Sequence, residues 1–238
     1  MEALTAGDVV RLWERAAGER DAARSLTLLD EALPGLAVDE LAVGDVERAL
    51  LELRELTFGP RLDAFVECPA CGEPLELALD VRELLGAEPP PTDGISLRDG
   101  DWTLKVRPLR AGDLLDVAGL SRKAARRRLL SASLLGVRRG GAEVDPSELP
   151  EEVVERVVAA LEACDPLAEV RVGLTCPGCG HEWSALFDAG TFLWAELGME
   201  ARRVLGEVHA LASAYGWREA DVMALGPARR QFYLEAIG

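Results

Sequence analysis

The chain has 238 residues, of which 49% are apolar, and its formal net charge is -16 at pH 7. A chain of this size can bury a sizeable core as one large domain or two small ones. The negative charge repels a phosphate backbone and argues against nucleic-acid binding as the main task. No run approaches the roughly 18 apolar residues of a membrane helix, and the N-terminus lacks a basic start and a long apolar stretch. We therefore expect a cytoplasmic protein with no membrane partner.

Residues 1–60 are predicted to form an N-terminal helical region. A first helix is expected in "GDVVRLWERA", with Asp8 as the candidate N-cap. A second is expected in "DAARSLTLLDEAL", which repeats apolar residues at helical spacing and ends at a Pro-Gly pair. A third is expected to begin at Asp45 and to end at a Gly-Pro pair.

Two phrases, "CPACGEPLELALD" and "CPGCGHEWSALFD", repeat one pattern more than a hundred residues apart. In each, a CPxCG knuckle is followed at the same offset by an apolar strand that ends in an aspartate, Asp80 or Asp188. Zn²⁺ prefers four soft ligands in a tetrahedron, and one CxxC turn supplies only two thiolates. We therefore expect residues 61–88 and 170–190 to be the two halves of one zinc ribbon. Its predicted ligands for one structural Zn²⁺ are Cys68, Cys71, Cys176 and Cys179.

The same cysteines are also compatible with two redox-active dithiols, as in a thiol oxidoreductase. Redox CxxC motifs in the cytoplasm usually lie between a strand and a helix and do not come as matched knuckles, so the pattern favours a structural metal. Four protein thiolates leave no open position for water, and the sequence has no phosphate loop or nucleophile elbow. We therefore expect the protein not to be an enzyme. His181 is a weaker ligand candidate, and its place in the knuckle loop favours a position on the surface or beside the ligands.

Residues 89–169, between the knuckles, are expected to form an inserted subdomain with helices and a strand. The stiff, polar break "EPPPTDG" marks its edge. "WTLKVRPL" alternates like a half-buried strand. "RAGDLLDVAGL", "SRKAARRRLLSASLL" and a stretch from Pro150 to Cys164 are read as helices. The expected fold class is α+β, mostly helical, with a split zinc ribbon and a long insertion between its halves.

One basic run, "SRKAARRRLL", contrasts with the acidic chain. At helical spacing Arg122 falls near Arg126, and Lys123 falls near Arg127. These residues form a positive stripe beside two leucines. A solvated helix face and a docking patch for an acidic partner are both consistent with this pattern.

Residues 191–238 are predicted to form a C-terminal helical region, broken at "YGW" and at a second Gly-Pro pair. Its apolar residues either fill a local core or form a docking helix pair, since aromatic and arginine side chains dominate protein interfaces. A DNA-binding helix-turn-helix has a similar outline, but the chain lacks a broad basic face. The candidate partner-binding residues are Tyr215, Trp217, Arg229, Arg230, Phe232 and Tyr233.

Two segments, "LLELRELTFGPRLDAFVECPACGEPLELALDV" and "LASAYGWREADVMALGPARRQFYLEAI", resemble the baseplate-hub assembly proteins of contractile-tailed bacteriophages and extracellular contractile injection systems. They cover about a quarter of the chain. The resemblance implies a non-enzymatic assembly or structural protein, free in the cytoplasm or attached to a particle, with hub, spike or tube proteins as partners. It carries over no catalytic residues. The alternative is a nucleic-acid-binding or transcription-associated zinc ribbon.

Overall fold

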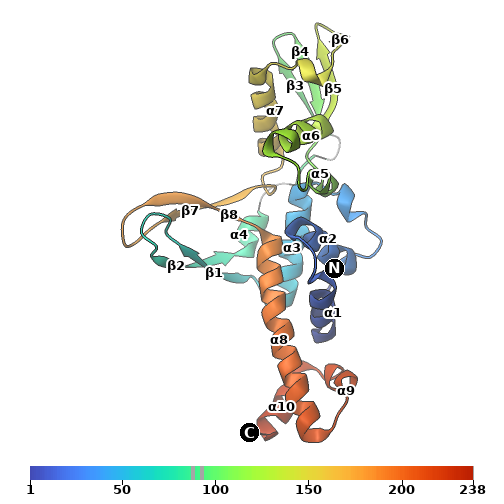
Figure 1. Ribbon diagram of the computed structural model, residues 1–238, viewed down its shortest axis with the longest axis vertical. Coiled ribbons are helices and arrows are strands. Elements are labelled where there is room, and N and C mark those ends of the chain that lie inside the picture. Colours follow the sequence, from blue (N-terminus) through green and yellow to red (C-terminus); the bar gives the residue numbers. More distant parts are fainter. Residues whose placement is uncertain (87–88, 92–93, 238) are drawn as a thin grey trace.

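The computed structural model describes residues 1–86, 89–91 and 94–237, and helices account for more of them than strands. The molecule is elongated (Figure 1). A helical body lies at the middle, a four-stranded sheet with two flanking helices lies at one end, and two β-hairpins project from the side. A small helical lobe forms the other end. The predicted break at residues 88–94 includes 88, 92 and 93, which lie outside the described residues.

The helical body is built from the N-terminal helices and one long helix near the C-terminus. The first helix begins one turn earlier than Asp8, because Thr5 is the N-cap and Asp8 completes a capping box by accepting from the Thr5 amide at 2.9 Å. The third helix likewise starts ahead of the predicted Asp45. The elements of the body are α1 (Ala6–Ala16), α2 (Asp21–Ala32), the 3-10 helix η1 (Val38–Glu40), α3 (Val43–Phe58) and α8 (Ala189–Tyr215).

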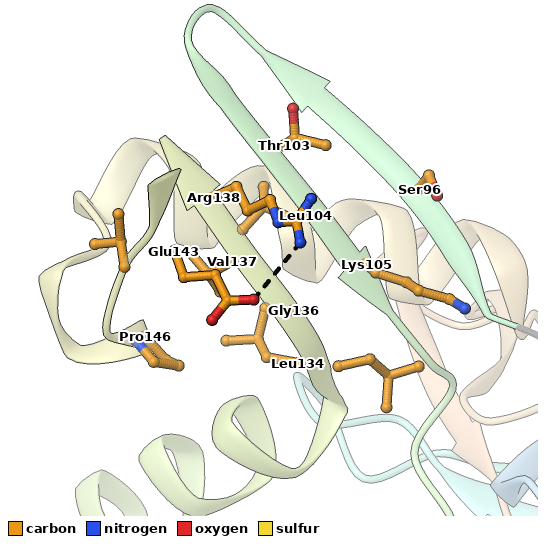
Figure 2. A pocket seen from close by; sticks show the side chains of 12 residues that line it. Ser96, Thr103, Leu104, Lys105, Leu134, Gly136, Val137, Arg138, Glu143 and Pro146 are labelled. Atoms are coloured by element: carbon orange, nitrogen blue, oxygen red, sulfur yellow. Dashed lines mark ion pairs between the residues drawn. The ribbon is translucent and has the colours of Figure 1, made fainter. Parts of the chain in front are cut away.

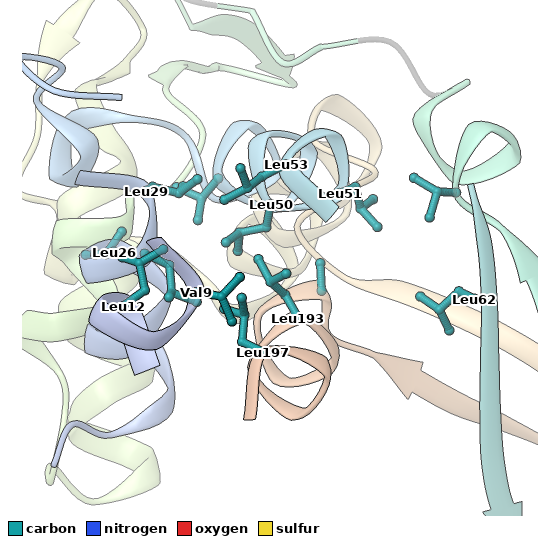
Figure 3. Close-up of a cluster of buried hydrophobic side chains, with 14 of the residues drawn as sticks. Val9, Leu12, Leu26, Leu29, Leu50, Leu51, Leu53, Leu62, Leu193 and Leu197 are labelled. Atoms are coloured by element: carbon teal, nitrogen blue, oxygen red, sulfur yellow. The ribbon is translucent and has the colours of Figure 1, made fainter. Parts of the chain in front are cut away.

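Aliphatic side chains from these helices form the main core (Figure 3). Leu12, Leu50 and Leu197 are fully or almost fully buried within it. Arg54 on α3, only 4% exposed, donates to both carboxylate oxygens of Glu196 on α8 at 2.9 and 2.6 Å. This bidentate pair and the apolar contacts fix α8 against α3.

The two hairpins are antiparallel ribbons that leave and rejoin the body. Each ends in an aspartate that caps the next helix: Asp80 accepts from the amide of Arg82 at 2.9 Å, and Asp188 accepts from that of Thr191 at 2.6 Å. The two aspartates stand at the same offset in the two phrases because each caps the helix that follows its hairpin. The elements are β1 (Arg61–Glu67), β2 (Pro74–Asp80) and α4 (Val81–Leu85) for the first hairpin, and β7 (Val170–Thr175) and β8 (Glu182–Phe187) for the second.

The segment between the hairpins holds an antiparallel sheet in the order β3-β4-β5-β6. The predicted strand at Trp102 is confirmed with alternating burial, and Val153 and Val157 pack on its buried side. Leu134, expected to continue a helix, instead begins a strand because it pairs with Val106 of β4. The elements are β3 (Ile95–Asp99), β4 (Trp102–Val106), α5 (Ala111–Asp116), α6 (Arg122–Ser133), β5 (Leu134–Arg139), β6 (Ala142–Glu143), the 3-10 helix η2 (Pro146–Glu148) and α7 (Glu151–Cys164).

The other face of this sheet is polar and borders a shallow hollow of about 550 Å³. Figure 2 shows Ser96, Thr103 and Lys105 along it, and an ion pair between Arg138 and Glu143 at 3.6 Å. The helix α7 covers only the opposite face. The sheet is thus half-buried, which explains why its strands alternate in polarity.

The inserted segment contacts the body through α5 and the end of α7. The amide of Gly44, at the start of α3, donates to Asp165 at 3.0 Å, and the amide of Val43 donates to the carbonyl of Leu109 at 2.9 Å. A Cβ at Gly44 would lie 1.8 Å from the Asp165 carboxylate, so this close approach requires glycine.

The C-terminal lobe packs against the far end of α8. Gly216 ends α8 in the left-handed conformation, with φ 68°. Val208 and Leu211 of α8 pack with the buried Val222 of α9 (Glu219–Met223), and α10 (Pro227–Ile237) packs against this cluster. Within the described ranges, no helix is both long and apolar enough to cross a membrane.

Candidate metal centre

The four knuckle cysteines meet at the tips of the two hairpins. Their sulfur atoms all lie within 4.8 Å of one another, although the two knuckles are more than a hundred residues apart in the chain. The prediction that Cys68, Cys71, Cys176 and Cys179 form one cluster is therefore confirmed.

The two knuckles have the same backbone hydrogen bonds. In each, the amide of the first cysteine donates across the turn, and the amide of the glycine donates back to that cysteine's carbonyl. Gly72 and Gly180 have φ values of 76° and 73°, a conformation that a side chain would strain. The CPxCG pattern thus folds into a turn with both thiols on one side. The bonds are Cys68 N to Glu73 O (2.9 Å), Gly72 N to Cys68 O (2.8 Å), Cys176 N to His181 O (2.9 Å) and Gly180 N to Cys176 O (2.9 Å).

The sulfur positions match a tetrahedral site. The sulfurs of Cys68 and Cys179 are 3.8 Å apart, and those of Cys71 and Cys176 are 3.6 Å apart. A tetrahedron with metal–sulfur arms of ~2.3 Å has edges of about 3.8 Å, whereas a disulfide requires about 2.05 Å. All four are free cysteines. The spacing therefore suits four ligands around one ion.

The electrostatics of the cluster also call for a cation. Burial raises the pKa of the Cys68 thiol, but backbone amides of Ala70 and Cys71 bond to its sulfur, and that pKa falls to about 7. The amide of Glu73 lowers the pKa of Cys71, yet the three neighbouring thiols and burial together raise it to about 12. Four sulfurs this close cannot all be negative unless a cation compensates the charge.

The surroundings of the cluster are small and partly open. Cys68 and Cys176 are 2% and 1% exposed and pack with Leu75, while the second cysteine of each knuckle is exposed. His181 lies on the surface with its ring stacked on Trp183, 5.9 Å between centroids. Trp183 packs against the two inner cysteines and Leu75. The sequence did not indicate this contact, because the first knuckle has no tryptophan at the matching position.

Each knuckle lies in the turn of a β-hairpin, between two strands. Redox CxxC motifs instead place their reactive thiol at the start of a helix, where the helix dipole stabilises the thiolate. The setting of these cysteines therefore favours metal binding over thiol exchange.

The predicted basic stripe lies on α6, with all its charged side chains exposed. Arg126 pairs with Glu151 at 2.6 Å, and Arg128 pairs with Asp116 at 3.3 Å. Among the residues that the structure describes, no carboxylate pairs with the three other cations, which are Arg122, Lys123 and Arg127.

The C-terminal candidates divide into an aromatic cluster and a buried arginine. Trp217 stacks on Tyr215 at 4.8 Å and meets Tyr233 edge-on at 4.9 Å, and the neighbouring Phe232 is 66% exposed. Arg229 is also exposed. The side chain of Arg230 is internal, with the residue 3% exposed and an ion pair to Glu207 on α8 at 2.9 Å.

The model of one protein family, described as "T4 bacteriophage base plate protein", matches residues 16–194. The chain belongs to this family. The match spans most of the body, both hairpins and the insertion, and confirms the resemblance at the level of a base plate protein. Neither a curated protein nor a solved structure matches this base plate protein.

Proposed function

We propose that this base plate protein is a non-enzymatic assembly or structural protein of a contractile, phage-tail-like particle, and that it acts at the hub or spike through contacts with hub, spike or tube proteins. The family match over residues 16–194 carries this proposal. The resemblance of the C-terminal segment to hub-assembly proteins supports the finer assignment, although that segment lies beyond the matched residues.

We propose further that the thiol cluster binds one Zn²⁺ as the core of a split zinc ribbon. Soft thiolates and tetrahedral spacing suit Zn²⁺, and four protein ligands leave no site for a substrate. The bound ion would supply structure alone by linking the ends of the inserted segment. The entropic cost of closing a loop grows only with the logarithm of its length. The free energy of metal binding would outweigh this cost.

Two surfaces are proposed to contact partners, one on the inserted segment and one on the C-terminal lobe (Figure 1). One is the stripe on α6. The other is the aromatic surface, which we define as Tyr215, Trp217, Phe232 and Tyr233 with Arg229 at its edge. Tyr215 and Phe232 are exposed, and Trp217 and Tyr233 are half-buried beside them. Aromatic side chains beside arginine are typical of interface hot spots. Arg230 is left out of this surface because its side chain pairs with Glu207 inside the lobe.

Affinity purification from the particle-producing host, with mass spectrometry, tests the proposal. We expect hub, spike or tube proteins to co-purify with the zinc-loaded chain. Phe232→Glu should reduce their recovery, because it places a charge in the aromatic surface without removing core contacts. Met199→Glu is the matched control, since Met199 is a similarly exposed apolar residue on α8. Recovery of polymerase subunits or nucleic acid instead would favour the nucleic-acid-binding zinc ribbon.

A further inference from the structure

A second concave surface, a groove of about 970 Å³, separates α6 from α7 beside the body. Its floor and walls are aliphatic and mostly half-buried. It lies on a different side of the insertion from the polar hollow in Figure 2, and the two share no lining residue. Its apolar lining includes Leu114, Ala125, Leu129, Val154, Val158 and Leu161.

The helix α7 has two apolar faces, one on the sheet and one along the groove, where Val154 is 6% exposed and Val158 is half-buried. Val153 and Val157 face the sheet and are buried there. Val154 and Val158, each one residue further along the helix, face the groove instead. An amphipathic helix normally has one apolar stripe toward its core, so a second stripe along an open groove indicates a surface for another element.

The charged residues that line the groove restrict the kind of segment that can bind in it. Arg122 and Arg126 line it from α6, a helix whose twelve residues include no acidic side chain. Glu162, Glu169 and Asp165 line the opposite margin together with Arg171, which pairs with Glu169. Arg126 also pairs with Glu151, whereas no carboxylate among the described residues pairs with Arg122, so Arg122 favours an acidic side chain on that flank of the occupant. Two copies of a chain with net charge -16 repel each other, which disfavours a second copy.

We propose that this groove binds an amphipathic helix of another base plate protein, with acidic residues on the flank that faces α6. Two helical walls with an aliphatic floor suit a helix that inserts apolar side chains at positions i, i+3, i+4 and i+7. The inference rests on the proposed function, because it names the partner chemistry of one of the two surfaces.

Photo-crosslinking in the particle-producing host tests this. Benzoylphenylalanine replaces Ala125 in the full-length chain, and the crosslinked peptide is sequenced. We expect a segment of a base plate component with acidic residues at helical spacing. The double variant Arg122→Glu and Arg126→Glu should lower the crosslink yield about tenfold, because it reverses the two charges with which α6 lines the groove. Lys105→Glu, a reversal in the polar hollow, should leave the yield unchanged.

A crosslink to a second copy of the chain, to nucleic acid or to a segment without acidic residues would overturn the proposal. So would a yield that the double reversal leaves unchanged, or the absence of a crosslink while base plate proteins still co-purify. In that last case the proposed function stands and only the groove fails. If no base plate protein co-purifies with the wild-type chain, the proposed function itself fails.

Discussion

The helical body and the hairpin tips are held together by different means. Aliphatic side chains from α1, α2, α3 and α8 interlock in the body (Figure 3). At the tips, Leu75 is the one buried aliphatic residue beside the two inner cysteines among the residues that the structure describes, and Val66 and Trp183 pack partly against them. Burial of so little apolar surface contributes only a few kcal/mol, roughly what the ordering of a few residues costs.

The difference shows why the knuckles are paired. A region with so small a core needs another source of cohesion, and the proposed metal bound by four thiolates would provide one. The body should then fold without the metal, while the hairpin tips should not hold together. Substitutions in the two regions can separate these dependences.

The largest effect is expected from Cys176→Ser. It removes one of four ligands, so we expect the metal content to fall from one ion per chain to none and the tips to separate. The region that metal binding stabilises should lose about 5 kcal/mol or more. Elemental analysis and hydrogen exchange of β1, β2, β7 and β8 measure the two effects.

Cys164→Ser is the matched control for this experiment. Cys164 is half-buried and its sulfur donates to the Leu161 carbonyl at 3.3 Å, a bond that a serine hydroxyl can replace. It should keep the metal. Unchanged metal content and melting in Cys176→Ser would show that the cluster is not a metal site.

Leu50→Ala is expected to have the opposite effect to Cys176→Ser: it should destabilise the body and leave the metal bound. Leu50 is fully buried at the centre of the core, and its truncation should lower the free energy of unfolding by about 3 kcal/mol. The metal content should stay at one ion per chain, because the tips lie outside this core. Leu56→Ala, at a half-exposed position of the same helix, should cost far less. Loss of metal in the folded Leu50→Ala protein would contradict the separation of the two regions.

Local signals in the sequence predicted much of this organisation. The knuckles were predictable because metal chemistry fixes their spacing, and the helix after Pro150 because proline suits a helix start. The strand at Leu134 was missed, because no turn residue separates it from α6 and its state depends on pairing with β4. Local pattern alone does not determine such a strand.

Two features of the proposed surfaces depended on distant parts of the chain. The burial of Arg230 depends on Glu207, which lies on another helix. The groove is lined by α6, α7 and segments near Val43 and Arg171, which no pattern within either helix brings together. The sequence therefore predicted the cluster of four cysteines better than it predicted the residues around the proposed surfaces.

Glu47 lies where the two regions join, and its predicted effect is the smallest. Its carboxylate accepts from the amide of Ala189, directly after the second hairpin, at 2.9 Å. Burial raises the pKa of Glu47 to about 7, and the Asp188 charge adds to the rise, while the Ala189 amide lowers it. Between the ordinary pKa of 4.5 and the raised pKa of about 7, Glu47 holds a proton in the folded protein that it releases in the unfolded chain. Stability from this group is therefore present at low pH and lost as pH rises through that window.

Glu47→Gln should remove this pH dependence, because the amide oxygen can still accept from Ala189 but carries no charge. We expect the variant to gain about 2 kcal/mol over the wild type near pH 8 and to gain little near pH 5. Denaturant unfolding of the metal-loaded proteins measures both differences. Glu52→Gln makes the same change on the exposed face of α3 and controls for the loss of a negative charge. Release of the metal at low pH would affect all three proteins alike, so it cancels from these differences. A gain in stability that is equal at both pH values would show that Glu47 is not a buried acid at this junction.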